Sequence, residues 1–351
     1  MGRLCAWPGA GIFDTIMNAI RSWLIGLLVV AVVVSSCRKT SFLDSIQDDA
    51  PAVFEEAWTV LDQRYALFRE KGIDWDSVRN VYAQQFVPGM SEQALFSTLS
   101  RMLETLRDGH LVLVSGTDTA AYDGYYRGYS RNFSLRHVLD NYLDGNYTSL
   151  GSLLFAVREN IGYIYVARFD TELGDDQRKR LAQAMEGTQG LIIDVRDNQG
   201  GLVQSASQLA SWLTDRSLLV KYEQFKTGLS RASFGDPIPY SLLPFTTPYL
   251  KPVIVLTNRA CFSACNDFVL YTAVMPQVKR YGDVTGGGGS IPSAYRLSNG
   301  WIMQYSATKT LSAALAPAEF GVFPDRQIEI SALDDARGRD PILEAAFNDL
   351  R

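Results

Sequence analysis

The sequence predicts an α/β protein with a mostly parallel sheet, and three observations lead to this fold class. From residue 161 onward, strand-like runs alternate with segments that carry apolar residues at helical spacing. One of these runs, Pro252–Thr257, is apolar and β-branched throughout, as a buried strand is. The 351 residues are 47% hydrophobic and 20% charged, which is a globular composition. Alternating strands and helices form mostly parallel sheets covered by helices.

The predicted elements follow one another in a regular order. Residues 51–115 form a small N-terminal helical module, because two segments carry apolar stripes before the strand-like run HLVLVS. Residues 116–160 are rich in tyrosine and glycine and predict a connecting, substrate-facing segment. The core, 161–351, has strands at IGYIYVARF, GLIIDVR, PVIVLT and WIMQYSATKT, and helices at DDQRKRLAQAMEG, SASQLASWLT and DFVLYTAVM.

The charge and the N-terminus bear on partners and location. A net charge of −5 and no long basic cluster argue against a nucleic-acid partner. The apolar run Trp23–Val34 is short for a transmembrane helix, and Arg21 precedes it. This layout predicts a secretory signal peptide over residues 1–36, with Met1 or Met17 as the start.

The signal sequence ends in VSSC, which resembles the bacterial lipobox. This resemblance implies that Cys37 is lipidated and that residues 37–50 are a polar tether. The protein would then be a lipoprotein of the bacterial envelope, on the periplasmic or outer-membrane face. A plain signal peptide or a single anchor helix remains the alternative.

The other cysteines predict neither a disulfide nor a metal site. Cys5 lies in the presumed leader, whereas Cys261 and Cys265 are only four residues apart. A disulfide would strain so short a loop, so we expect buried free thiols. Two thiols without a nearby histidine do not predict zinc, and we expect no metal and no cofactor.

Ser263 lies in NRACFSACND, between a predicted strand and a predicted helix. Serine is a preferred helix N-cap, so a capping role is one interpretation. A nucleophile at a helix N-terminus is the other. In that case the N–H of Ala264 would point toward an oxyanion formed at the serine.

Two further groups are candidates for the same chemistry. A serine nucleophile needs a base, and His110 in LRDGH can project into a cleft, whereas His137 lies in an amphipathic segment. In IIDVRDNQGG, the pair Gly200 and Gly201 lets backbone N–H groups approach a ligand. Both Ser263 and these glycines follow strand ends, which places them at one edge of the sheet. In the same motif, Asp194 and Arg196 are expected to form a structural ion pair.

Taken together, the motifs resemble a known family. GYIYVARF, LIIDVRDNQGG, VIVLTNRACFSACNDF, YGDVTGGGG, FGVFPD and GRDPILEAA occur in the order found in the carboxy-terminal processing (tail-specific) peptidases and the tricorn core proteases. The resemblance covers about residues 50–350 and implies a crotonase/ClpP-like core. Residues 116–160 are too few for the PDZ domain that many processing peptidases carry.

The resemblance also assigns roles to residues. Ser263 falls on the nucleophile, and Gly288 stands where the processing peptidases have their lysine base. The tricorn-like branch uses a histidine that precedes the core, which matches His110. An acid near the G-V-x-P-D motif orients that base, which implies Glu319, with Asp325 as the second choice.

The function expected from this resemblance is a serine-type endopeptidase. Ser263 would attack a peptide bond, His110 would transfer the proton, and Gly200, Gly201 and Ala264 would form the oxyanion hole. Two alternatives stay open: an inactive peptide-binding envelope lipoprotein, and an esterase or amidase with the same dyad. The oligomeric state and the identity of the peptide or protein substrate are not predicted.

Overall fold

The computed structural model describes residues 50–351, which belong to one compact unit. The predicted signal peptide, the lipidation site Cys37 and nearly all of the tether lie outside the described residues. Within the described part, no helix is both long and apolar enough to cross a membrane.

The helices of the described part are α2 (Ala50–Arg64), α3 (Trp75–Tyr82), η1 (Ala83–Gln85), α4 (Glu92–Glu104), α5 (Leu135–His137), η2 (Val138–Tyr142), α6 (Asp175–Met185), α7 (Val203–Ser211), α8 (Ala264–Thr272), α9 (Ala332–Ala336) and α10 (Pro341–Leu350). The strands are β1 (Val112–Val114), β2 (Thr119–Ala121), β3 (Thr148–Leu150), β4 (Leu153–Arg158), β5 (Ile161–Val166), β6 (Gly190–Asp194), β7 (Leu218–Phe225), β8 (Ile238–Leu242), β9 (Val253–Thr257), β10 (Val278–Gly282), β11 (Pro292–Arg296), β12 (Ile302–Ser306), β13 (Thr308–Ser312) and β14 (Arg326–Gln327).

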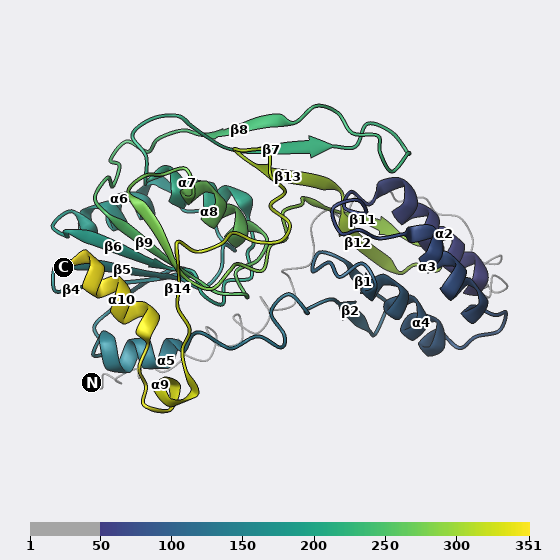
Figure 1. Ribbon diagram of the computed structural model, residues 1–351, viewed down its shortest axis with the longest axis horizontal. Coiled ribbons are helices and arrows are strands. Elements are labelled where there is room, and N and C mark those ends of the chain that lie inside the picture. The colour runs from purple at the N-terminus through teal and green to yellow at the C-terminus, as the bar shows by residue number, and fades with distance from the viewer. Residues whose placement is uncertain (1–49) are drawn as a thin grey trace, which may run out of the picture. The chain divides into compact units, whose positions relative to one another are not determined.

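Seven strands form the central sheet, in the order β14-β10-β9-β6-β5-β4-β3. The five strands from β14 to β5 run parallel, and β4 and β3 are antiparallel to their neighbours. Helices α6, α7 and α8 pack on one face and α10 on the other (Figure 1). This arrangement confirms the predicted α/β class. Strands β5, β6 and β9 are buried throughout because helices cover both faces.

The sheet extends before the predicted start of the core. Strands β4 and β5 form a hairpin whose two-residue turn, Glu159 and Asn160, has φ values of 51° and 62°. Left-handed conformations at both positions are typical of a type I′ turn, which matches the twist of the flanking strands. The predicted boundary at residue 160 therefore falls inside this turn.

A second sheet completes the helical module predicted over 51–115. It is antiparallel, in the order β11-β12-β1-β2, and Trp301 and Met303 share a core with Leu99 of α4. The run WIMQYSATKT, predicted as one strand, is divided at Ala307. Its first half is β12, whereas its second half, β13, joins a three-stranded sheet with β7 and β8.

Candidate active site

The loops that follow β6 and β9 meet at one edge of the central sheet. The two strands are parallel neighbours, so their carboxyl ends lie side by side. A Cβ atom on Gly200 would lie 2.9 Å from both the Cβ of Ser263 and the N of Ala264. Gly200 has a φ of 93°, so this position suits glycine both sterically and conformationally.

Ser263 adopts a strained backbone conformation, with φ 56° and ψ −123°. Few non-glycine residues occupy this region, and those that do gather at functional sites. Its side chain makes no capping hydrogen bond to α8, so the capping interpretation is wrong. Instead, Ser263 Oγ lies 2.9 Å from His110 Nε2, and its N–H donates to Gly287 O over 3.0 Å.

His110 is held in place by the Asp-Gly-His turn between α4 and β1. The carboxylate of Asp108 accepts the backbone N–H of His110 at 2.8 Å, and Gln304 on β12 donates to its carbonyl at 3.1 Å. The imidazole packs on Phe262, with ring centroids 4.8 Å apart. Gly109 permits this packing, because a Cβ atom there would lie 2.6 Å from the Phe262 ring.

Burial lowers the pKa of His110 below its ordinary value. The carboxylates of Asp108 and Asp267 raise this pKa and Lys71 lowers it, but burial dominates. His110 is only 5% exposed. A neutral imidazole at neutral pH can accept the proton of the serine hydroxyl, which is what a general base requires.

Two backbone donors near Ser263 are free within the described residues. The N–H of Gly200 donates to Asn198 Oδ1 at 2.8 Å, so it is already used. No hydrogen bond in the described part uses the N–H of Gly201 or of Ala264. Of the two predicted glycine donors, Gly201 is therefore the one available to an oxyanion.

Neither acid predicted to orient His110 bonds to it. Glu319 pairs with Lys71 at 2.6 Å through Oε1, and its Oε2 accepts the N–H of Gly289 at 3.1 Å. Asp325 pairs with Arg280 at 2.7 Å. His110 Nδ1 has no hydrogen-bond partner among residues 50–351. The prediction that Glu319 or Asp325 holds the imidazole is thus wrong in this structure, because each carboxylate is taken by a cation from elsewhere in the chain.

Other polar residues fix the loops around the site. The expected ion pair is present: Arg196 Nη2 lies 2.6 Å from Asp194 and also 2.8 Å from Asp340, the N-cap of α10. Asn266 lies in α8, three residues after Ser263. It accepts the hydroxyl of Thr285 at 2.6 Å, which ties the glycine loop to α8.

Aromatic rings pack beside Gly288, the position at which the resemblance implied a lysine in the processing peptidases. A Cβ atom on Gly288 would lie 2.5 Å from the Phe262 ring, and Gly288 has a φ of 77°. Tyr125, from the tyrosine-rich segment, stacks on Phe262 with centroids 4.2 Å apart. The sequence motifs did not predict Phe262, Tyr125 or Asp108 as part of the site, although an Asp-Gly pair before a histidine is a turn signal.

Both thiols beside the nucleophile are buried and free, as predicted. Cys261 donates to Val195 O at 3.0 Å. Among residues 50–351, no cluster of three or more histidine, cysteine or acidic side chains could hold a metal ion.

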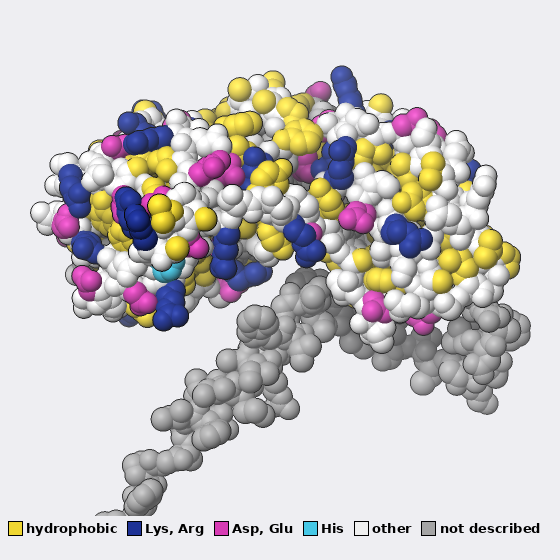
Figure 2. All heavy atoms as spheres, turned by 60° about the horizontal axis from the view of Figure 1, so that its bottom comes forward, with side chains coloured by type: hydrophobic (Ala, Val, Ile, Leu, Met, Phe, Trp, Pro, Cys, Tyr) yellow, Lys and Arg dark blue, Asp and Glu magenta, His cyan; other side chains and the backbone are white. Residues whose placement is uncertain are grey.

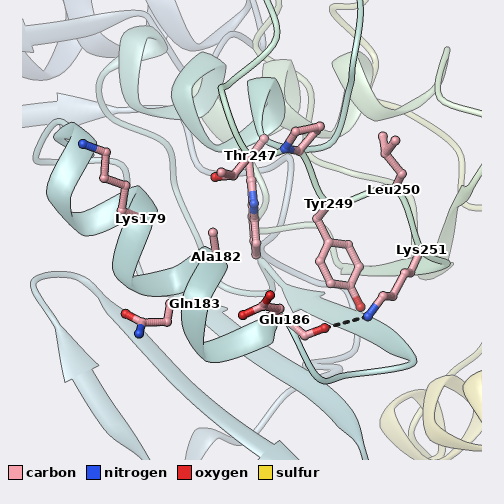
Figure 3. A pocket seen from close by; sticks show the side chains of 10 residues that line it. Lys179, Ala182, Gln183, Glu186, Thr247, Tyr249, Leu250 and Lys251 are labelled. Atoms are coloured by element: carbon pink, nitrogen blue, oxygen red, sulfur yellow. Dashed lines mark hydrogen bonds between the residues drawn. The ribbon is translucent and has the colours of Figure 1, made fainter.

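A cavity of about 410 Å³ adjoins the site. The tyrosine-rich segment and the loops after β6 and β9 line it, through residues that include Tyr129, Gln199 and Ala260. Another cavity, of about 450 Å³, lies between α6 and the segment before β9 (Figure 3). Lys251 there donates to Glu186 O at 2.7 Å, and none of the predicted site residues lines it. On the face drawn in Figure 2, basic and acidic side chains are interspersed.

Comparisons with known proteins identify the family of this chain. The model of peptidase family S41 matches residues 160–328, and that of the tricorn protease C1 domain matches residues 47–104. A C-terminal processing peptidase from the chloroplast of Tetradesmus obliquus is 27% identical over 51% of this chain and 37% of the relative. The chain spans roughly a third of the length of the curated relatives it matches.

Solved structures extend the likeness to most of the chain. The crystal structure of a candidate peptidase from Parabacteroides merdae is 36% identical, with a TM-score of 0.82, and the match covers 86% of this chain and 97% of that one. The tricorn protease has the same fold at 17% identity and a TM-score of 0.57, over 87% of this chain and 37% of that one. On the family match and the Parabacteroides structure, the chain belongs to peptidase family S41.

Proposed function

We propose that this protein is a serine endopeptidase in which Ser263 is the nucleophile and His110 the general base. The observation that carries the proposal is the 2.9 Å contact between Ser263 Oγ and His110 Nε2. A nucleophile and base within hydrogen-bond reach is the signature of an activated serine. The strained backbone of Ser263 and its unused capping role support the same assignment.

The reaction follows from the geometry. Ser263 Oγ attacks the peptide carbonyl carbon while its proton moves to His110 Nε2. The resulting oxyanion accepts hydrogen bonds from the N–H groups of Ala264 and Gly201. Collapse of this intermediate breaks the C–N bond, and Nε2 returns the proton to the leaving amine. Water then hydrolyses the acyl-enzyme by the same steps in reverse order.

Each part of the site contributes to the rate. In other enzymes one oxyanion donor is worth about 3–4 kcal/mol in the transition state. The buried, neutral imidazole of His110 supplies a base at neutral pH. The cavity of about 410 Å³, lined by Gln199 and Ala260 from the loops that carry Gly200 and Ser263, offers room for a substrate side chain.

A fluorophosphonate reagent tests the nucleophile without a known substrate. We expect covalent labelling of the full chain at Ser263, identified by peptide mass spectrometry, and none in Ser263→Ala. His110→Ala should lower the labelling rate by at least 100-fold, since the hydroxyl then lacks its base. Labelling of His110→Ala at the wild-type rate would refute the dyad.

A substrate panel separates the peptidase from the alternatives. Incubation with a proteome-derived peptide mixture should give cleavage products with the wild type and none with Ser263→Ala. Hydrolysis of small esters without peptide cleavage would favour an esterase or amidase. Peptide binding with neither labelling nor cleavage would favour a binding protein.

We also propose that the protein is a lipid-anchored envelope protein. The support is the sequence VSSC after an apolar run, with Cys37 as the lipidated residue. Cys37→Ser should abolish incorporation of radiolabelled palmitate in a bacterial host and release the protein from the membrane fraction. Unchanged incorporation would disprove the anchor.

A further inference from the structure

Three buried polar atoms near His110 make no hydrogen bond of good geometry within residues 50–351, although the Tyr65 hydroxyl lies close enough to Asp108 for a weak one. They are His110 Nδ1, Asp108 Oδ2 and the hydroxyl of Tyr65. Buried polar groups usually have partners, so a group of three orphans beside a catalytic base needs a physical reason. Asp108 supplies the one carboxylate of the group.

Asp108 is fully buried and belongs to the same turn as His110. Its Oδ1 accepts the backbone N–H of His110 at 2.8 Å, which leaves Oδ2 free. Among the described residues it forms no ion pair with lysine or arginine. In contrast, both oxygens of Glu319 are committed, one to Lys71 and one to Gly289.

Charged groups from several elements face this turn. Lys71 follows α2, Asp267 comes from α8, and Glu319 comes from the segment after β13; Tyr65 packs beside Asp108. Asp267 shares Lys221 with Glu223, at 2.8 and 2.6 Å, and Glu319 pairs with Lys71. Of the three carboxylates near the imidazole, Asp108 is the one without an ion-pair partner among the described residues.

We propose that Asp108 is the positioning residue of this active site. It favours the neutral His110 tautomer that carries its proton on Nδ1, so that Nε2 can accept the proton of Ser263. It also stabilises the imidazolium that forms during acyl transfer. This inference rests on the proposed function, but its test can fail or succeed separately.

The first measurement is the tautomer of His110, read from imidazole ¹⁵N shifts of the full chain. The chain has only two histidines, so His137→Gln leaves His110 as the single signal. We expect the Nδ1–H form at pH 8. A predominant Nε2–H form would overturn the proposal. This measurement needs no variant at Asp108 and no enzymatic activity.

The second measurement uses Asp108→Asn, which keeps an acceptor for the backbone N–H but removes the charge. We expect the pKa of His110 to fall by at least one pH unit. We also expect fluorophosphonate labelling of Ser263 at pH 8 to slow by at least tenfold, with its acid limb moved to lower pH. An unchanged pKa and an unchanged rate would show a merely structural role. Asp325→Asn, another acid-to-amide change, should match the wild type in both readouts.

A third variant separates Asp108 from Glu319. In Lys71→Met/Glu319→Gln, both charges of the ion pair are removed and an acceptor for Gly289 remains. We expect labelling within about threefold of the wild-type rate. A large loss here, with Asp108→Asn unaffected, would assign the role to Glu319. If the wild type itself is not labelled, the proposed function fails, and the tautomer and pKa of His110 still decide the role of Asp108.

Discussion

The buried pair of Lys71 and Glu319 should make the protein less stable as the pH rises from about 4.5 to 7. Burial, followed by the charge of Asp108, raises the pKa of Glu319 from 4.5 to about 7, although Lys71 opposes this. Between these values the unfolded chain loses the proton while the native state keeps it. The native state then binds more protons, so the free energy of unfolding falls with increasing pH. The difference between the two pKa values corresponds to about 3.5 kcal/mol, at about 1.4 kcal/mol per pH unit, of which about 3 kcal/mol falls between pH 4.5 and 7.5.

The double variant Lys71→Met/Glu319→Gln tests this reasoning. Urea unfolding at pH 4.5, 6 and 7.5 gives the free energy of unfolding of both proteins. We expect the wild type to lose about 3 kcal/mol relative to the variant over this range, because the variant lacks the titrating carboxyl. His110 titrates in both proteins. Its contribution to the pH dependence of stability, which has the opposite sign to that of Glu319, therefore largely cancels in the comparison.

A matched control is available at the other acid considered for the site. Arg280→Met/Asp325→Asn removes a partly exposed ion pair, with Asp325 41% exposed. Such pairs contribute about 0–1 kcal/mol, so this variant should follow the wild-type pH dependence. Parallel curves for the wild type and the Lys71/Glu319 variant would refute the assigned pKa of Glu319.

Three further outcomes follow from the site. Ser263→Gly should be more stable than Ser263→Ala by about 1 kcal/mol in urea unfolding, because glycine relieves a strain of about 1–3 kcal/mol at φ 56° but costs backbone entropy. Gly288→Lys should lower the urea midpoint and supply no new base, since its Cβ atom would collide with Phe262. Burial raises the pKa of Cys265. With a chromogenic disulfide reagent, Cys265 and Cys261 should therefore react no faster than the protein unfolds.

The central sheet was predictable because its signals are local. The parallel strands β6 and β9 are short apolar runs, and parallel neighbours present their carboxyl ends at one edge. From this rule alone, Ser263 and the glycine pair were expected to meet, and Gly200 does lie against Ser263. Non-local pairing was harder to predict. The alternation in WIMQYSATKT continues across Ala307 and carries no sign that β12 and β13 belong to different sheets.

The contact between Ser263 and His110 joins residues 153 positions apart, and no local pattern in the chain specifies it. The family resemblance provided this partner. The same resemblance suggested Glu319 from its position near the G-V-x-P-D motif. Such a spacing gives the position of an acid along the chain but not its partner in the fold. In the structure, Lys71 from the segment after α2 pairs with Glu319 at 2.6 Å.

Asp108 illustrates the opposite case, in which a local signal was present but its meaning depended on burial. An aspartate two residues before a histidine is usually a solvated turn residue. Here the turn is enclosed, Asp108 is fully buried, and its second oxygen has no partner within the described residues. Low exposure makes an unpaired charge act strongly on its neighbours. The packing of Phe262 and Tyr125 beside Gly109 encloses this turn, so the role proposed for Asp108 depends on burial that the local sequence does not reveal.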